Sequence, residues 1–527
     1  AAGRRGRRPL QRPPGSLAKF SAFYFLHAPS LQGSHKPPLA FPHGFCYNRQ
    51  TVKKKIERIE EERGVHLSLR KKYIGNAAFY KMALAVAVPI MIQNGITNFV
   101  SLLDNIMVGR VGTEQMTGVA IVNQLIFVFN LAIFGGISGP GIYGAQYYGQ
   151  RNEEGFRHTF RIKLWICLAC VIIGTLIFMT SGETLISMYL HGESAQMDAA
   201  LTMHLGKEYM TIMLFTLLPF SITQVYASSL RETGYSVKPM IAGILSVIVD
   251  IVFNYLLIFG KFGMPRLEVK GAAIATLLAR IVECVIVVAW AHYERRTHSF
   301  LIGIYRTMRI PKEISILMIK KGLPIFFNEF LWAGGLAALT QCYSTKGLEI
   351  IAGLTISNVI CNLLNVVFVA LGSAVGILSG QTLGAGKFEK AKENAFHLMW
   401  FTCFVCVGLT VILIAFSGIF PKVYDTTEQV RGYGQKFIVI TALFFPIQGL
   451  LNSLYFTLRS GGKTVITFLF DSVFSWVVTV PVAAVLCLTT PLSVFVIYAI
   501  VQSLDLIKVA IGYGLIRKGI WISTIVD

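Results

Sequence analysis

Long apolar bands separated by short polar breaks run through most of this chain. A helix needs about 20 mainly apolar residues to cross the hydrocarbon core of a bilayer, and a membrane β-strand is an alternating segment of only about ten residues. Twelve bands of helical length follow one another after residue 77. They lie at 78–103, 117–145, 160–180, 205–230, 236–260, 271–293, 314–341, 349–377, 395–419, 434–457, 464–487 and 491–516. The pattern predicts an all-α membrane protein with twelve transmembrane helices.

The sequence also repeats itself with one constant offset. A shift of 235 residues superimposes Pro89-Ile90 on Pro324-Ile325, Gly118 on Gly353, Asn123 on Asn358, Gly141 on Gly376, Gln146 on Gln381 and Gly149 on Gly384. Further along, where the shift has changed to 228 residues because loop lengths differ, SSLRETG at 228–234 is repeated as FTLRSGG at 456–462, and we call these two segments the LR motifs. Because each copy holds an even number of helices, both copies point the same way and a pseudo-two-fold axis along the membrane normal relates them. We expect two six-helix lobes with the substrate path between them.

The N-terminal part of the chain has a different character from the rest. Residues 1–72 carry sixteen Lys or Arg against four Glu, and residues 1–50 contain no acidic residue, as in targeting leaders. We interpret 1–72 as a basic extension, either disordered or a leader, and a transit peptide would indicate an organelle membrane. The remaining chain divides into an N lobe (73–293), an inter-lobe linker (294–321) and a C lobe (322–527).

The distribution of Lys and Arg predicts the orientation. The breaks after even-numbered bands, counted with the adjoining turns of the bands and the C-terminal segment, carry twenty of these residues, whereas the breaks after odd-numbered bands, counted in the same way, carry nine. Cytoplasmic loops retain positive charge. We therefore expect a multi-pass protein of the cell membrane with both termini in the cytoplasm.

Composition excludes several other classes of protein. Mean hydropathy is +0.60 and only 14% of residues are charged, too apolar for a soluble nucleic-acid-binding protein. An enzyme would need a nucleophile–base pair or a metal cluster at the membrane face, and none is visible. GGKT at 461–464 lacks the upstream glycine of a phosphate-binding loop. Eight of the nine cysteines, two C-x-x-C pairs included, lie in the apolar bands or at their edge and are interpreted as packing residues. We expect neither enzymatic activity nor a cofactor or bound transition metal.

Ionisable side chains inside the bands are the candidate functional groups, because a charge at bilayer depth costs several kcal/mol unless it is paired or hydrated. Asp104 closes the first band. Asp250 and Asn254, four residues apart in the fifth band, share one helix face. Together these groups could form an oxygen cage for a small hard cation or carry a proton after desolvation. The structural alternative is a loop cap at Asp104 and a helix contact at Asp250.

Other polar residues in the bands have more open roles. Glu329 occupies the repeat position of Asn94, and it could couple an ion, contact substrate or join helices. Gln93, Asn94, Asn123 and Asn358 are predicted to line the substrate cavity. A cavity lined by aromatic side chains and a few acids would favour flat, lipophilic cations.

Two oppositely charged pairs are spaced for mutual neutralisation. Arg280 and Glu283 lie three residues apart in the sixth band, as do Asp505 and Lys508 in the twelfth. We interpret both pairs as structural.

Taken in order, several motifs resemble the multidrug and toxic compound extrusion (MATE) transporters, within the superfamily that also holds lipid and polysaccharide flippases. The resemblance covers 78–516. It rests on the motifs DNIMVGRVG at 104–112, GAQYYGQRN at 144–152, NYLLIFGKFGMP at 254–265, GAAIAT at 271–276, SGQTLGAGKFEKA at 379–391 and LRSGGKT at 458–464. It implies a two-lobed, monomeric antiporter in membrane lipid. Such a protein exports small organic, often cationic, compounds while protons or sodium move inward. The alternative within the superfamily is a flippase of lipid-linked oligosaccharides.

The resemblance also implies roles for particular residues. Asp104 is similar to the family's first-helix acid, and Asp250, Asn254 and Thr276 fall where one branch has a cation-site cluster. That branch usually has Asn first and Asp four residues later, the reverse of the order here. Glu329 resembles an acid of the sodium-coupled branch, whose second acid in the tenth helix has no counterpart in 434–457. The coupling ion is therefore left open between proton and sodium.

Overall fold

The computed structural model describes residues 75–190, 198–424 and 426–526. Within these ranges every regular element is helical, and twelve helical spans are long and apolar enough to cross a membrane. Hydrocarbon offers no hydrogen-bond partners, so a spanning segment must satisfy its backbone internally, as a helix does. The predicted all-α class with twelve spans is confirmed, while the extension at 1–72 lies outside the described residues.

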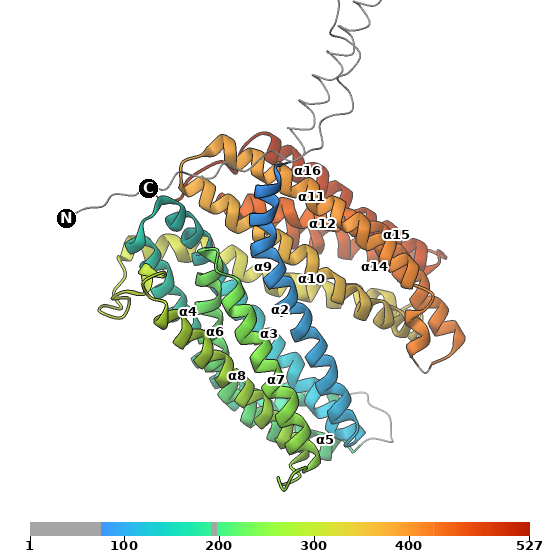
Figure 1. The fold of residues 1–527 in the computed structure, drawn as a ribbon. Helices are drawn as coiled ribbons and strands as arrows, with labels where there is room; N and C mark the ends of the chain where they lie inside the picture. Colours follow the sequence, from blue (N-terminus) through green and yellow to red (C-terminus); the bar gives the residue numbers. More distant parts are fainter. Residues whose placement is uncertain (1–74, 191–197, 425, 527) are drawn as a thin grey trace, which may run out of the picture. The chain divides into compact units, whose positions relative to one another are not determined.

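The first six spans form the N lobe (Figure 1). They are α2 (Ala77–Gly109), α3 (Thr113–Gln150), α4 (Glu153–Leu190), the span of α5 (Ala199–Met213), η1 (Leu214–Thr216) and α6 (Leu217–Glu232), α7 (Val237–Phe259) and α8 (Glu268–Tyr293). Side-chain caps begin two of these helices, because Asn76 accepts from the amide of Phe79 and Asp198 accepts from the amide of Ala200.

The last six spans form the C lobe in the same order. They are α9 (Lys312–Ser344), α10 (Leu348–Gly384), α11 (Phe388–Phe416), α12 (Glu428–Ser460), the span of α13 (Thr464–Phe468), η4 (Leu469–Val473), η5 (Ser475–Thr479) and α14 (Val480–Thr489), and the span of α15 (Val494–Ser503) and α16 (Asp505–Arg517). Short 3-10 helices η2 (Ser299–Leu301) and η3 (Phe420–Val423) lie in two connections. The turns η4 and η5 are π-helical.

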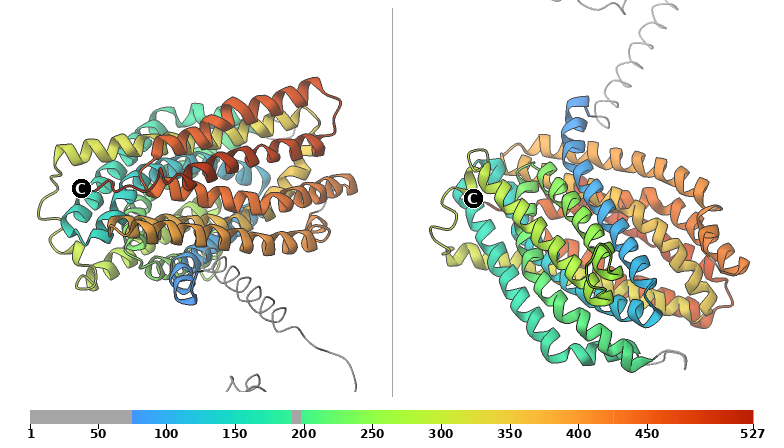
Figure 2. Two further views of the ribbon diagram at one scale, coloured as in Figure 1. Left: turned by 90° about the horizontal axis from the view of Figure 1, so that it is seen from above. Right: turned by 60° about the horizontal axis from the view of Figure 1, so that its bottom comes forward.

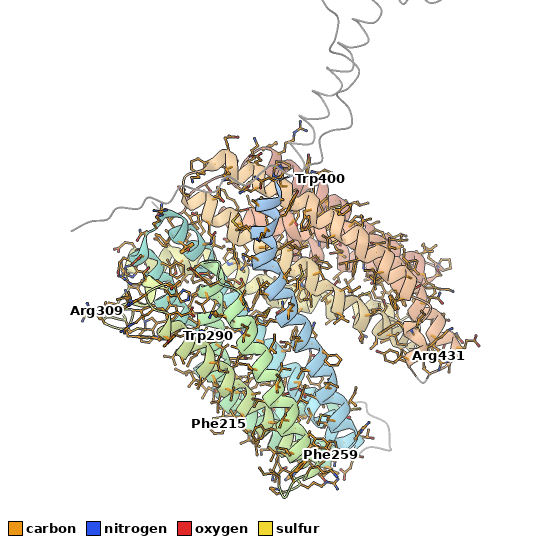
Figure 3. The ribbon with its side chains drawn as sticks, in the orientation of Figure 1. Phe215, Phe259, Trp290, Arg309, Trp400 and Arg431 are labelled. Atoms are coloured by element: carbon orange, nitrogen blue, oxygen red, sulfur yellow. The ribbon has the colours of Figure 1, made fainter. Side chains whose placement is uncertain are left out.

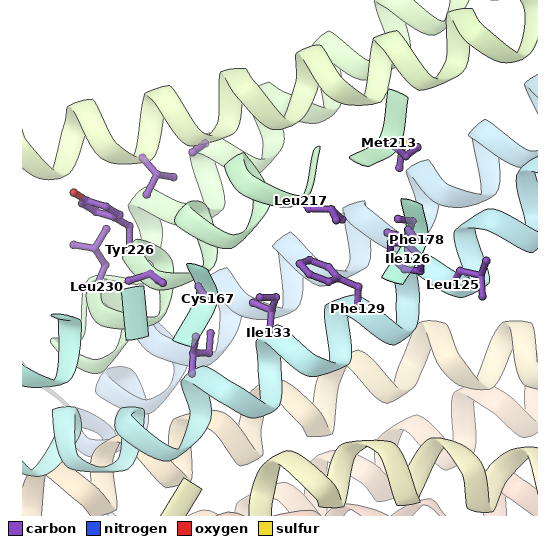
Figure 4. Packing of buried hydrophobic residues seen from close by; sticks show 14 of the residues in the cluster. Leu125, Ile126, Phe129, Ile133, Cys167, Phe178, Met213, Leu217, Tyr226 and Leu230 are labelled. Carbon is purple, nitrogen blue, oxygen red and sulfur yellow. The ribbon is translucent and has the colours of Figure 1, made fainter. Parts of the chain in front are cut away.

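The long helix α3 lies at the centre of the N lobe. Figure 4 shows Phe129 and Ile133 of α3 facing Leu217 of α6 and the helices around it. Cys167 of α4 is buried in the same cluster, which agrees with its interpretation as a packing residue. No group of three or more His, Cys, Asp or Glu able to hold a metal occurs in the described ranges.

The lobes meet where α3 and α10 cross, and the residues in contact there are related by the internal repeat. A methyl group added to Gly149 of α3 would lie 2.0 Å from the carbonyl oxygen of Gln381 on α10. One added to Gly384 of α10 would lie 2.0 Å from the carbonyl oxygen of Gln146 on α3. Glycine at both positions therefore lets the two backbones touch. Both residue pairs are related by the 235-residue offset, so the crossing lies on the pseudo-two-fold axis.

Two glutamine side chains complete this crossing. Gln146 Nε2 donates to the carbonyl oxygen of Ser460, at 2.9 Å, and Gln381 Nε2 donates to that of Glu232, at 2.7 Å. Ser460 and Glu232 are the last residues of α12 and α6, and the 228-residue shift of the LR motif relates them. Each lobe thus uses a glutamine to hold a helix end of the other lobe.

Two helix pairs flank the crossing. Ala87 of α2 packs in one buried cluster with Ala374 of α10, and a methyl group on Gly139 of α3 would lie 2.3 Å from the Cα of Gly322 on α9. The offset maps Ala87 onto Gly322 and Gly139 onto Ala374. These contacts lie in the halves of the helices nearest the Lys- and Arg-rich breaks, which we call the basic end.

At the other end the lobes are separate. Figure 3 shows Phe259, the last residue of α7, far from Arg431 in the first turn of α12. Figure 1 likewise shows the lobes diverging away from the crossing. The bundle is therefore joined at its basic end.

The connection between the lobes packs on the N lobe. Arg161 Nε donates to the carbonyl oxygen of Ile304, at 3.0 Å, and Trp165 Nε1 to that of Met308, at 3.2 Å. Phe300 is buried in the N-lobe core. Burial lowers the pKa of His298 in this segment, so its side chain is neutral at pH 7.

Gly149→Val tests the crossing. We expect it to lower the free energy of unfolding by about 1–3 kcal/mol, because the new side chain would overlap the Gln381 carbonyl. Thermal unfolding of the purified protein in detergent measures the effect. Gly95→Val is the matched control, since a methyl group on Gly95 of α2 meets no atom within 4 Å. Equal midpoints for the two variants would contradict a close backbone crossing.

Candidate functional site: a buried acidic cluster in the N lobe

Two carboxylates and one amide meet inside the N lobe. Asn254 Nδ2 donates to Asp104 Oδ1, at 2.8 Å, and to Asp250 Oδ2, at 3.2 Å. Asp104 comes from the penultimate turn of α2, whereas the other two residues lie one helical turn apart on the buried face of α7. The structure thus brings together three residues that the sequence singled out.

Two polar residues of other helices extend the cluster. Tyr209 of α5 donates its hydroxyl to Asn123 Oδ1 of α3, at 3.2 Å. Thr276 of α8 lies close to both Tyr209 and Asp250. Asn123, predicted to line the substrate cavity, therefore belongs to the surroundings of the acidic cluster.

Two oxygens of the cluster have unused hydrogen-bonding capacity. Asp250 is 5% exposed and Asn254 is 1% exposed. No hydrogen bond of good geometry reaches Asp250 Oδ1 or Asn254 Oδ1 within the described residues. Buried oxygens are nearly always satisfied in folded proteins, so these two are suited to receive a proton or a small cation.

Arg280 of α8 places one positive charge near the cluster. It acts electrostatically on both Asp104 and Asp250, while its Nη1 donates to Glu283 Oε2 at 3.0 Å. The ion pair with Glu283 was predicted from the spacing. Its position beside the two aspartates was not, since sequence spacing says nothing about contacts between helices.

The C lobe holds a second polar cluster, nearer the basic end. Asn328 Nδ2 of α9 donates to Asp471 Oδ2 of η4, at 3.1 Å, and Ser472 Oγ donates to Asn328 Oδ1, at 2.7 Å. Lys508 of α16 lies 3.1 Å from Asp505 and 3.9 Å from Asp471. The predicted Asp505–Lys508 pair therefore has a third member.

Glu329 joins this second cluster rather than the first. It lies close enough to Arg459 and Asp471 to interact with both charges. Its Cγ would also lie 3.3 Å from a methyl group on Gly135 of α3. Glu329 is thus part of the contact between the lobes as well as of the C-lobe cluster.

Sequence reasoning missed Asp471, although the same criterion could have found it. It is an aspartate inside the eleventh apolar band, and the 228-residue shift aligns it with Gly243. The family resemblance places an acid beside Glu329 in the tenth band, 434–457, which has none. The structure supplies that neighbour from the following span.

The other predicted cavity residues are scattered. Gln93 is buried and accepts a hydrogen bond from Arg231 Nη2, at 2.6 Å. Asn94 is partly exposed on α2, and Asn358 is exposed on α10. The LR motifs place Arg231 and Arg459 at equivalent positions of α6 and α12, and each of them lies beside the first helix of its lobe.

A buried ion pair at the basic end was also missed. Lys163 Nζ of α4 lies 2.6 Å from Glu232 Oε1 of α6 and within 3.2 Å of the hydroxyls of Ser228 and Ser229. Lys163 is fully buried. The pair holds the end of α6 whose carbonyl accepts from Gln381 of the other lobe. Lys163 lies near the start of the third predicted band, 160–180, and its charge is one of the twenty counted with the Lys- and Arg-rich breaks.

A duplicated twelve-helix bundle, joined at one end and carrying a buried acidic cluster in one lobe, has the architecture of a secondary transporter. The chain belongs to the MatE family, whose model matches residues 89–256 and 324–511. Multidrug efflux transporters make up this family, and the predicted family membership is confirmed.

Curated relatives cover most of the chain. It is 26% identical over 436 residues to a probable multidrug resistance protein, YoeA, of Bacillus subtilis, an alignment that covers 81% of this chain and 91% of the relative. It is 24% identical over 414 residues to the probable multidrug resistance protein NorM of Thermotoga maritima, covering 77% and 85%.

Solved structures share the two-lobed fold. A MOP superfamily transporter from Pyrococcus furiosus, described as having a binding pocket of reverse polarity, aligns with a TM-score of 0.74 at 18% identity, over 86% of this chain and 97% of that one. An outward-facing multidrug resistance MATE family transporter aligns with a TM-score of 0.74 at 19% identity, over 84% and 95%. At these identities the comparison establishes the fold.

Lys163→Met tests the buried ion pair. It leaves the Glu232 charge buried without its ion-pair partner, so we expect the free energy of unfolding to fall by about 3–5 kcal/mol. Thermal unfolding in detergent measures the loss, and Lys163→Met combined with Glu232→Gln should recover much of it. Lys207→Met, which removes an exposed partner of Glu183, should leave the midpoint unchanged. A stable single variant would show that the pair contributes nothing.

Proposed function

We propose that this chain is a secondary active antiporter that exports small organic compounds in exchange for protons or sodium. The observation that carries the proposal is the pair Asp104 and Asp250 sharing one amide donor, Asn254. Two adjacent carboxylates in a low-dielectric interior repel one another, so a bound proton or cation stabilises the site. The open oxygens of Asp250 and Asn254 would accept that ion.

The position of α2 suggests how ion binding is coupled to movement. One end of α2 carries Asp104 in the cluster, and the other end carries Ala87 against Ala374 of the C lobe. An ion that changes the hydrogen bond between Asp104 and Asn254 changes how firmly α2 is held to α7. The same helix would then transmit the change to the contact between the lobes, which is the requirement for alternating access.

The proposed class of substrate follows from the named relatives and from the acidic side chains inside the bundle. Relatives are named as multidrug resistance proteins, and acids in an apolar bundle favour organic cations or lipophilic compounds. Asn94, which is partly exposed on α2, and Asn358, which is exposed on α10, are proposed to face the substrate. The basic end is proposed to be cytoplasmic, in line with its excess of Lys and Arg, and the protein to act as a monomer surrounded by lipid.

Removing either carboxylate should abolish coupled export. In efflux-deficient cells, Asp104→Asn and Asp250→Asn should each reduce the initial rate of dye export at least tenfold at unchanged protein level, since a neutral amide cannot exchange a proton or balance a cation. Glu389→Gln, which neutralises an exposed acid in the first turn of α11, is the matched control. Native export rates in both aspartate variants would rule out the proposed role.

The coupling ion can be assigned in proteoliposomes. With a proton gradient and a sodium gradient imposed separately, one of them should drive uptake of a cationic dye into vesicles of the native protein, and Asp250→Asn should abolish that response. A dye flux that ignores both gradients would contradict antiport. Transfer of a lipid-linked oligosaccharide between leaflets without either gradient would favour the flippase alternative.

A further inference from the structure

The segment after α16 crosses from one lobe to the other at the basic end. We call residues 518–526 the strap. In the left-hand view of Figure 2 its dark red trace runs from α16 toward the helices of the N lobe. Gly519, with a φ of 71°, turns the chain immediately after the helix ends. The strap is therefore directed away from the C lobe as soon as α16 finishes.

Trp521 anchors the strap to the C lobe. Its side chain is fully buried in a cluster with Leu458 and Ile516. A methyl group added to Gly461 would lie 1.8 Å from the Trp521 carbonyl oxygen, and Ser523 Oγ donates to the Gly461 carbonyl oxygen at 3.0 Å. Backbone contact, a hydrogen bond and a large apolar side chain thus hold this part of the strap.

The other end of the strap is held by the N lobe. The amide of Ile525 donates to Gln146 Oε1 of α3, at 2.9 Å, and Gln150 Nε2 donates to the Val526 carbonyl oxygen. Val526 is 2% exposed and belongs to the N-lobe core cluster. The same Gln146 side chain holds Ser460 of the C lobe. The strap therefore binds directly on top of the crossing of α3 and α10.

The internal repeat shows that the surface on which the strap packs, at Gly461 and Gly462, differs between the two lobes. Gly461 and Gly462 correspond to Thr233 and Gly234 of the N lobe. A methyl group on Gly462 would lie 2.6 Å from Ile525, whereas one on Gly234 would meet no atom within 4 Å. The GG sequence thus provides space that the strap fills, and the equivalent surface on the N lobe is not filled in this way.

From this geometry we infer that the strap is a releasable latch, which stabilises the state closed at the basic end and slows opening there. Opening must separate α3 from α10. Only three residues lie between Trp521 and Ile525, and a chain extends at most about 3.6 Å per residue. The strap cannot follow both lobes apart. Its N-lobe end is the one to release, because two hydrogen bonds and one valine hold it, against a buried tryptophan at the other end. This inference rests on the alternating access of the proposed function.

Distances between spin labels test the latch without any transport assay. Labels at Glu153→Cys, at the start of α4, and Lys390→Cys, in the first turn of α11, report on separation at the basic end, in a background that lacks the nine native cysteines. Both positions are exposed. The full chain is measured in lipid nanodiscs by pulsed electron paramagnetic resonance, with no substrate or ion gradient present.

Two variants weaken only the N-lobe attachment. Gln150→Ala removes the donor to Val526, and we expect the ratio of open to closed molecules to rise about threefold to tenfold, as for the loss of one hydrogen bond. Val526→Asp places a charge in an apolar seat and should raise the ratio by at least tenfold. Gln429→Ala, which removes an exposed glutamine at the opposite end, should leave the ratio unchanged.

Unchanged distance distributions in both variants, with native unfolding midpoints, would overturn the latch. If Val526→Asp does not fold, Gln150→Ala alone decides. The result is separable from the proposed function, because loss of the latch leaves Asp104 and Asp250 in place. If the strap variants change the distances but the native protein shows no gradient-driven transport, the latch is supported and the antiporter proposal is rejected.

Discussion

The structure depends on the absence of hydrogen-bonding solvent in the bilayer core. That constraint forces each spanning segment into a helix, and it also requires every polar side chain between the helices to find a partner within the protein. Lys163 meets Glu232 and two serines, and Asn328 meets Asp471. The cluster of Asp104, Asp250 and Asn254 satisfies the requirement only in part, because Asp250 Oδ1 and Asn254 Oδ1 receive no hydrogen bond within the described residues. For this reason we propose it as the site for an ion.

The second organising feature is the duplication. Small residues, rather than charged ones, bring the lobes together at equivalent positions, and the glutamines Gln146 and Gln381 then exchange hydrogen bonds with the opposite lobe. Two lobes joined in this way can separate at one end without disrupting either core, as a transporter requires.

The two copies have diverged in their chemistry while keeping this frame. Asp104 corresponds to Leu339, and Asp471 corresponds to Gly243. As a result the N-lobe cluster lies toward the separated end, and the C-lobe cluster, with Glu329 at its edge, lies toward the joined end. The strap adds a further asymmetry, because only the C lobe has the paired glycines that seat it.

The amino-acid sequence was enough to predict the twelve helices, the duplication and the place of Asp104 and Asp250 in the apolar bands. These properties follow from local hydropathy and from the spacing of residues along a single helix. Both can be read from the sequence without knowing which helices touch. It also placed Asp250 and Asn254 on one face, since i and i+4 meet on any helix. Four further contacts are seen only in the folded chain. Asn254 bridges to Asp104, Arg280 lies beside the pair, Asp471 is the neighbour of Glu329, and residues 518–526 bind across the crossing of α3 and α10. Each of these is a contact between segments far apart in the chain, and such contacts depend on how helices pack against one another, which no single helix encodes.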